Sequence, residues 1–545
     1  MKKKVSYFLS LSVAVSMLLT ACNSDKTNEG GKKDTAKAKP QVLNLLGGAE
    51  LPGLDSGTTT DAESFNVLGN IMEGLNVLGK DDVVQPGIAE TTDKSEDGLT
   101  YTFHLRDAKW SNGEAVTAKD FEYAWKRAAD PKNASEYAFM MNVLQNGEEV
   151  TTGKKPVDQL GVKAIDDKTL EVKLAKAIPY FDSLVTFPTF LPLNQKYVES
   201  QGKDYALEAD KLIFNGPFEL SEWKHDESYK LVKNPDYYGA NDVSLKEINF
   251  KIVKDPQTAV NLYESGEVDR AGLTAEFVDK YKNNPDYGTT KEPTVFFLRV
   301  NETKNPALKN VNIRKALNEA FNREDITNVI LNNGSVPLYG LAPSNFLDAN
   351  GKDFREASGD LVKYDPTNAK TLWEQGLKEI DKKDVTIELL GSDTETNKKI
   401  SEYLQGELTK NLPGLKINIK SVPFAQQLDL NSKKDYEVSF GGWGPDYKDP
   451  MTFFDMWTTQ SPFNQMGFSN PEYDKLISQA GGEFLLDPAK RSDAFVKAEK
   501  ILVQDNAAIL PIYQRAIAYV MKPKVTGLIE HSFGSDYTYK NVVIK

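Results

Sequence analysis

The sequence predicts a mixed α/β protein built from several domains, and three observations support this fold class. The chain has 545 residues, which is three or four times the length of a typical domain of about 150 residues. Hydrophobic residues make up 40% of the chain and charged residues 27%, enough apolar material for several cores. Beyond Pro40, strand-like and helix-like hydrophobic patterns are mixed along the whole chain.

The first 40 residues predict a signal peptide and a tether. Lysines at 2–4 precede an apolar run over 5–19, which is shorter than the roughly 20 residues of a membrane-spanning helix. The run ends in Leu-Thr-Ala-Cys, which resembles the lipobox of bacterial lipoproteins. We therefore expect a signal peptide over 1–21 and a lipid anchor at Cys22; an ordinary signal with an incidental cysteine is the alternative. Residues 23–40 contain no large apolar side chain, so 22–40 is expected to be a flexible tether.

Two later stretches show the local patterns most clearly. Apolar residues alternate with polar ones over 101–106, which predicts a half-buried strand, and a helix with one apolar face is expected from about 117 to the Asp-Pro at 130–131. A second unit reads as a strand over 385–390, a turn at 391–393, a helix ending at Gly414 and a strand from Leu415. This order predicts a βαβ crossover in a parallel region.

Charge and composition exclude several functional classes. The 66 Lys and Arg against 79 Asp and Glu give a net charge of −13, which disfavours a nucleic-acid partner. One cysteine allows no internal disulfide, and three histidines leave little for metal or imidazole chemistry. No G-x-S-x-G, H-E-x-x-H, P-loop or G-x-G-x-x-G motif occurs. We therefore expect a binding protein, not an enzyme, with no catalytic residue, cofactor or metal.

Four motifs narrow the class of binding protein. They are WSNGEAVTAKDF at 110–121, NGPF at 215–218 with Trp223 following, NPDYY at 234–238, and NIRKAL at 312–317. In order and spacing the chain resembles, from about residue 41 to its end, the oligopeptide- and dipeptide-binding proteins of ABC importers, extracellular solute-binding protein family 5. The resemblance implies a monomer that captures oligopeptides and delivers them to importer permease subunits. The lipobox and the tether resemble those of the Gram-positive members of this family. The resemblance implies a protein that a lipid anchors to the extracellular face of the membrane.

The resemblance also implies a domain organisation. It predicts a two-lobed clamshell of the periplasmic-binding-protein type (type II, cluster C) with an additional third domain. Lobe I would combine 41–72, 197–295 and 516–545, the extra domain would span 73–196, and lobe II would span 296–515. Two chain crossings between the lobes would form a hinge that lets ligand favour the closed state.

The strongest candidate site is the segment GGWGPDYKDP at 441–450. Glycines such as Gly442 and Gly444 allow close backbone approach, and Trp443 offers a flat apolar wall. The resemblance implies that the Asp of Trp-x-x-Asp-Tyr, here Asp446, meets the peptide N-terminus. Asp449 is instead expected to cap a helix before Pro450.

Two further segments supply candidates. By family position, Thr60 and Ala62 would offer backbone groups to the peptide, although an exposed polar turn explains the same residues. Phe297 and Arg299 share one face of a predicted strand, which family position puts near the cleft. Arg299 can receive a peptide carboxylate or an acidic side chain, and a structural salt bridge is the equal alternative.

Two other functions stay open from the sequence. The same scaffold serves non-peptide ligands such as a metal chelate or haem, and a surface peptidase or chaperone is a third possibility. The sequence leaves the preferred peptide length and the residue that binds the peptide C-terminus unassigned.

Overall fold

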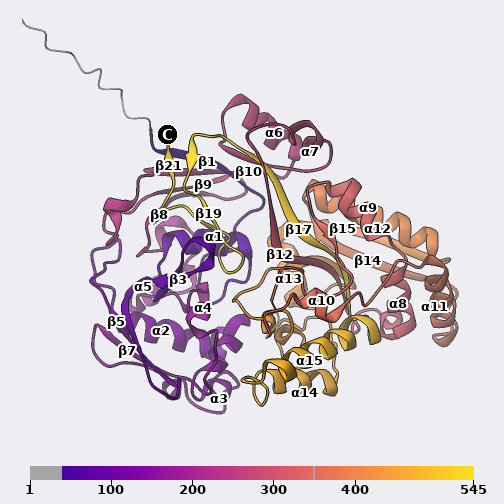
Figure 1. Ribbon diagram of the computed structural model, residues 1–545, viewed down its shortest axis with the longest axis horizontal. Coiled ribbons are helices and arrows are strands. Elements are labelled where there is room, and N and C mark those ends of the chain that lie inside the picture. The colour runs from indigo at the N-terminus through magenta and orange to yellow at the C-terminus, as the bar shows by residue number, and fades with distance from the viewer. Residues whose placement is uncertain (1–39, 348–349) are drawn as a thin grey trace, which may run out of the picture. The chain divides into compact units, whose positions relative to one another are not determined.

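The computed structural model describes residues 40–347 and 350–545 (Figure 1). The predicted signal peptide, Cys22 and the tether up to residue 39 lie outside these residues. Pro40–Lys545 form one compact unit. Within the described part of the chain, no helix is long and apolar enough to cross a membrane.

A four-stranded sheet joins distant parts of the chain in the order β1-β10-β9-β8. Its strands are β1 Val42–Gly47, β8 Phe218–Lys224, β9 Ser228–Lys233 and β10 Glu247–Ile252. β1 pairs with β10 in parallel, and the other pairs are antiparallel. Gln41 Nε2 donates to the Ile544 carbonyl oxygen, and the Ile544 amide donates to Gln41 Oε1. The last residues of the chain therefore lie beside the start of β1.

A second four-stranded sheet, in the order β4-β5-β7-β6, lies within the predicted extra domain. Its strands are β4 Ala89–Lys94, β5 Thr100–Leu105, β6 Val162–Ala164 and β7 Thr169–Lys173. The predicted strand over 101–106 is confirmed as β5, with alternate residues buried. The predicted helix is α2 Ala118–Ala129, which begins with a capping box between Thr117 and Asp120 and ends before Asp130.

The largest sheet has seven strands, in the order β11-β17-β12-β16-β14-β15, with β13 paired to β17. They are β11 Arg270–Leu273, β12 Tyr287–Val300, β13 Val336–Pro337, β14 Val385–Ser392, β15 Leu415–Val422, β16 Val438–Trp443 and β17 Ile509–Met521. The predicted βαβ crossover is confirmed, because β14 and β15 pair in parallel with α12 between them. The first strand runs two residues further than predicted, and the helix ends at Asn411.

The helices surround these sheets (Figure 1). Besides α2 they are α1 Ala62–Ile71, α3 Gly147–Thr151, α4 Phe181–Leu184, α5 Gln195–Gln201, α6 Pro256–Ser265, α7 Glu276–Tyr281, α8 Val311–Glu319, α9 Arg323–Asp325, α10 Phe354–Ser358, α11 Pro366–Glu379, α12 Glu395–Asn411, α13 Phe424–Ser432, α14 Pro471–Ala480 and α15 Pro488–Glu499. Three short strand pairs complete the fold: β2 Asn76–Leu78 with β3 Val84–Pro86, β18 Val525–Thr526 with β21 Val543–Ile544, and β19 Ile529–Glu530 with β20 Tyr537–Thr538.

The long strands β12 and β17 are neighbours in the largest sheet. They lie between β11 on one side and β16, β14 and β15 on the other. They pair antiparallel from Tyr287↔Val520 to Arg299↔Ile509, and the register shifts between Lys291 and Val295. The predicted boundaries at 295/296 and 515/516 fall inside these two strands. Beyond the register shift, one face of β12 packs into a core formed with α8, α11 and α12.

Candidate functional site

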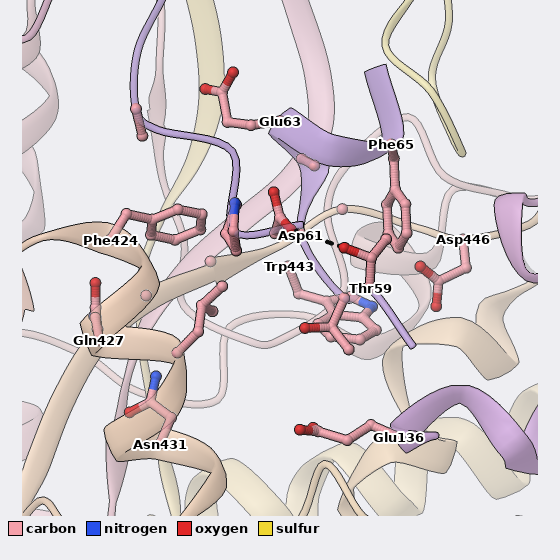
Figure 2. Close-up of a pocket in the computed structure, with 18 of the residues that line it drawn as sticks. Thr59, Asp61, Glu63, Phe65, Glu136, Phe424, Gln427, Asn431, Trp443 and Asp446 are labelled. Carbon is pink, nitrogen blue, oxygen red and sulfur yellow. Dashed lines mark hydrogen bonds between the residues drawn. The ribbon is translucent and has the colours of Figure 1, made fainter. Parts of the chain in front are cut away.

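A cavity of about 810 Å³ collects segments that are far apart in the sequence. Its walls come from the loop between β1 and α1 together with the start of α1, a short segment at 136–137, β12, α13, the end of β16 with the loop that follows, and a C-terminal loop near 531–536. Figure 2 shows side chains from these segments facing the same space. Its volume is within the range of ligand-binding clefts.

One wall of the cavity is a strand edge without a strand partner. β16 pairs along its length with β12, but β14 pairs with it only at Val438 and Ser439. From Phe440 to Trp443 no described strand pairs with the opposite edge, and the Phe440 carbonyl oxygen accepts from Gln427 Nε2 at 2.7 Å. Gly441 lines the cavity, and a Cβ added there would meet no atom within 4 Å. The lack of a side chain at Gly441 thus leaves free space over the strand at this position.

Thr452 holds the indole of Trp443 close to the backbone of Asp446. The Trp443 Nε1 donates to the Thr452 carbonyl oxygen at 3.0 Å, and the Asp446 amide donates to the Thr452 hydroxyl at 2.9 Å. Both residues line the cavity, as do Gly442 and Gly444. The structure therefore brings together all four candidates from this segment.

Asp446 is a buried carboxylate without a cationic partner among the described residues. Its side chain accepts a hydrogen bond from the Tyr137 hydroxyl at 3.0 Å, and the residue is 5% exposed. In residues 40–347 and 350–545, no lysine, arginine or histidine lies within 4.0 Å of the carboxylate. Burial, and then the negative charge of Asp455, raise the pKa of Asp446 well above its usual value. A cation entering the cavity would stabilise the ionised form.

Asp449, three residues after Asp446 and directly before the helical turn at Pro450, has a structural role. Its carboxylate accepts from the Met451 amide at the start of a short helical turn, which confirms the predicted cap. It also forms two 2.7 Å hydrogen bonds with the buried guanidinium of Arg491. The sequence did not predict this pair, because 42 residues separate its members.

Thr60 and Ala62 also line the cavity, at the start of α1. Between them Asp61 caps the helix by accepting from the Ser64 amide, and the Thr59 hydroxyl contacts it at 3.4 Å (Figure 2). Burial raises the pKa of Asp61 to about 6 and that of Glu63 to about 7. Sequence reasoning missed both carboxylates, although the Asp-Ala-Glu-Ser pattern is a helix-start signal that marks Asp61.

Phe297 and Arg299 occupy different positions relative to the cavity. Arg299 lines it, whereas Phe297 is fully buried and is not a lining residue. The Phe297 ring packs edge-on against Trp457, with centroids 5.6 Å apart, and this contact covers it. The structural salt bridge considered for Arg299 does not form with any described residue; its Nη1 instead donates to Gln465 at 2.6 Å.

Glu136 and Tyr137 were not among the predicted site residues. They lie in a segment of the predicted extra domain, yet both line the cavity (Figure 2 labels Glu136). Tyr137 contacts Asp446, and Glu136 accepts from the Gln465 amide at 3.0 Å. No local sequence pattern marks these two residues, because their significance depends on contacts across more than 300 positions.

Comparison with known proteins agrees with this architecture. The family model described as bacterial extracellular solute-binding proteins, family 5 middle, matches residues 83–465. A dipeptide-binding protein of Lactococcus lactis is 36% identical, with 100% of both chains covered. The dipeptide-binding protein DppE of Bacillus subtilis is 35% identical over 96% of each chain.

Solved structures are similar over nearly the whole described region. The substrate-binding domain of an oligopeptide ABC transporter from Bacillus anthracis has 47% identity and a TM-score of 0.92, covering 93% of this chain and 99% of its own. OppA of Listeria monocytogenes bound to peptide has 41% identity and a TM-score of 0.90, covering 93% and 100%.

The Escherichia coli murein tripeptide-binding protein MppA is represented by two structures, both 27% identical to this chain. Both cover 93% of this chain, with 99% of the first MppA chain and 98% of the second. The TM-score is 0.84 for the first and 0.59 for the unliganded open form. The fold described above is therefore closer to the first arrangement than to the open one.

Proposed function

This chain belongs to family 5 of the bacterial extracellular solute-binding proteins, and from this premise we propose that it captures oligopeptides and delivers them to an ABC importer. Capture would take place in the cavity between β16, α1 and the segment at 136–137. The proposal includes the absence of catalysis: the protein binds and releases its ligand unchanged.

The observation that carries the proposal is the open edge of β16 beside an unpaired carboxylate. A peptide of any sequence offers backbone amides and carbonyls, which can extend a sheet at a free edge. At Gly441 the cavity is open, because a Cβ added there would meet no atom within 4 Å. Thr60 and Ala62, which also line the cavity, would by family position give the peptide a second set of backbone partners.

Asp446 is proposed to hold the peptide α-amine. It lies at the Trp443 end of the strand edge, and its Oδ2 accepts no hydrogen bond from the described residues. An ammonium placed there would form a charge-assisted hydrogen bond in a water-poor site. Trp443, Gly442 and Gly444 would line the first residues of the peptide.

We propose that the cavity opens and closes by a hinge within β12 and β17. Lobe I (41–72, 197–295 and 516–545) and lobe II (296–515) would move as near-rigid bodies, with the extra domain at 73–196 carried by lobe I. The register shift between Lys291 and Val295 supports a hinge at this level of the strands. Ligand between the lobes would stabilise the closed arrangement.

Identification of the co-purifying ligand tests the proposed function. Native mass spectrometry of the purified protein should give a family of bound masses that differ by amino-acid residues. One discrete mass matching a haem or a metal chelate would overturn the peptide assignment and support the non-peptide alternative. Shortening of added peptides during incubation would instead support a surface peptidase.

The location of the protein is part of the proposal. The signal peptide over 1–21 and the lipobox at Cys22 support a lipid anchor on the extracellular face of the membrane, with 22–40 as the tether to a monomeric globule. Cys22→Ser should release a folded protein from membranes, because the thiol is the proposed lipid acceptor and the compact unit begins only at Pro40. A variant that stays with membranes after a high-salt wash would contradict the anchor.

A further inference from the structure

The α13 side of the cavity contains a group of polar side chains that the proposed function leaves unused. This polar chamber is formed by Arg299, Glu136, Gln465, Asn431, Ser432 and Ser439, all of which line the cavity. Arg299 and Ser439 are cross-strand neighbours on β12 and β16, and Gln465 bonds both Arg299 and Glu136. Figure 2 shows Glu136 and Asn431 facing the same space.

Arg299 is a buried cation that forms no ion pair with a described residue. It is 8% exposed, and its one hydrogen bond to a described residue joins Nη1 to the neutral amide oxygen of Gln465 at 2.6 Å. Its Nε is buried without a partner. By contrast Arg515, another arginine of the cavity wall, has an ion pair with Glu292 at 2.5 Å. A buried charge without a direct counter-charge is expensive, so Arg299 has unused capacity to bind an anion.

A second polar side chain of the chamber is also unsatisfied. Asn431 is 7% exposed, and its Oδ1 has no hydrogen-bond partner among the described residues. It lies at the end of α13, on the cavity wall. Buried amide groups in folded proteins are normally hydrogen-bonded. An unsatisfied donor, Arg299 Nε, and an unsatisfied acceptor, Asn431 Oδ1, on one side of the cavity indicate a ligand that carries both an acceptor and an N–H donor, as a peptide does.

The carboxylate of Glu136 does not fill this need. It is separated from Arg299 by Gln465, whose amide nitrogen donates to Glu136 Oε2 at 3.0 Å. Burial raises the pKa of Glu136 above its usual value, and the charge of Arg299 acts in the opposite direction. No carboxylate of a described residue forms an ion pair with the Arg299 guanidinium, whose one hydrogen bond to a described residue goes to Gln465.

We infer that the polar chamber binds a carboxylate of the peptide ligand and that Arg299 recognises it. The inference rests on the proposed function and adds a preference in ligand chemistry. Guanidinium groups with free N–H donors bind carboxylates in preference to neutral groups. The unsatisfied Oδ1 of Asn431 is an acceptor, so it would bond an N–H of the same peptide and not the carboxylate itself.

The strand register gives the distance of this chamber from the amine site. Val295 faces Trp443 and Arg299 faces Ser439, so the chamber lies about 13 Å along the sheet from Trp443 at roughly 3.3 Å per residue. An extended peptide with its amine at Asp446 covers that distance in about four residues. The bound carboxylate is therefore the C-terminus of a short peptide or an acidic side chain near position four of a longer one.

Calorimetric titration with matched peptides tests the inference. One series consists of hexapeptides with Glu or Gln at positions three, four or five; the other consists of a tetrapeptide with a free or an amidated C-terminus. Wild-type protein should bind at least one carboxylate form at least about tenfold more tightly than its neutral counterpart, a difference of about 1.4 kcal/mol. A side-chain effect and a C-terminal effect identify the two sources of the carboxylate, and either supports the inference.

Three variants assign the effect to Arg299. Arg299→Gln should reduce the carboxylate-to-neutral affinity ratio towards one while neutral peptides still bind. Gln465→Glu should also reduce this affinity ratio, although the arginine is retained, because the new carboxylate would pair with Arg299 Nη1 where the amide oxygen lies now. This variant provides the test if Arg299→Gln does not fold. Lys203→Gln, which removes an exposed cation of the same cavity wall, should keep the ratio.

The outcomes separate this inference from the proposed function. Peptides that bind wild-type protein with no carboxylate preference in any matched pair overturn the inference and leave peptide capture standing. A preference that persists in both Arg299→Gln and Gln465→Glu also overturns it. Failure of every peptide to bind the wild-type protein overturns the proposed function itself.

Discussion

Replacing Asp446 with asparagine removes a charge while keeping the local structure. The Asp446 amide bonds Thr452 through the backbone, so this contact is unaffected. An asparagine oxygen can still accept the hydrogen bond from the Tyr137 hydroxyl. Asp446→Asn therefore tests the carboxylate charge with little disturbance of the cavity wall.

The expected loss follows from the burial of this carboxylate. An ammonium about 3 Å from it is attracted by roughly 5 kcal/mol at an effective dielectric constant near 20, before desolvation is subtracted. Losing one partner of such a buried pair costs about 2 to 5 kcal/mol. Because the pKa of Asp446 is raised by burial, part of the attraction is used to ionise the carboxyl group. We therefore expect a loss of at least about 1.4 kcal/mol, a tenfold weaker affinity for free-amine peptides.

A double-mutant cycle with N-acetylated peptides isolates the contact. Calorimetric titration should show that acetylated peptides bind wild-type protein poorly and lose little more affinity in Asp446→Asn, because both changes remove one interaction. Affinity for free-amine peptides should also fall as the pH drops through the raised pKa of Asp446, since protonation removes the charge; the variant should lack this dependence. Additive losses, or an unchanged affinity of Asp446→Asn, would show that the amine is bound elsewhere.

Three further predictions concern the cavity wall, its support and the hinge. Gly441→Val should weaken all peptides at least about tenfold without lowering thermal stability, because its Cβ has open space; Gly272→Val in β11, equally open but outside the cavity, is the control and should bind normally. Asp449→Asn should lower the free energy of unfolding by about 3 to 5 kcal/mol, because it leaves Arg491 buried without its partner; a loss below about 1 kcal/mol in denaturant titration would contradict this role. Saturating peptide should reduce the radius of gyration in X-ray scattering, and an unchanged curve from a demonstrably open free state would count against hinge closure.

Local elements were predictable because neighbouring residues determine them. The alternation over 101–106 and the apolar stripe after Thr117 each require only the periodicity of a strand or helix with one buried face. Asp449 as a helix cap is also a local property, since its carboxylate reaches an amide two residues away. The cavity-lining segment at 441–446 was recognisable as a candidate site because its residue types and its resemblance to a family pattern lie in one short stretch.

The electrostatic state of the site was decided by the tertiary structure alone. A sequence shows that Asp446 and Arg299 are charged, but packing decides that Asp446 meets Tyr137, 309 positions away, and that Arg299 meets the neutral Gln465, 166 positions away. Asp449, which is equally acidic, meets Arg491 and becomes structural. Whether a buried charge is satisfied or free to bind ligand depends on which groups share its low-dielectric surroundings, and only the folded chain brings those groups together.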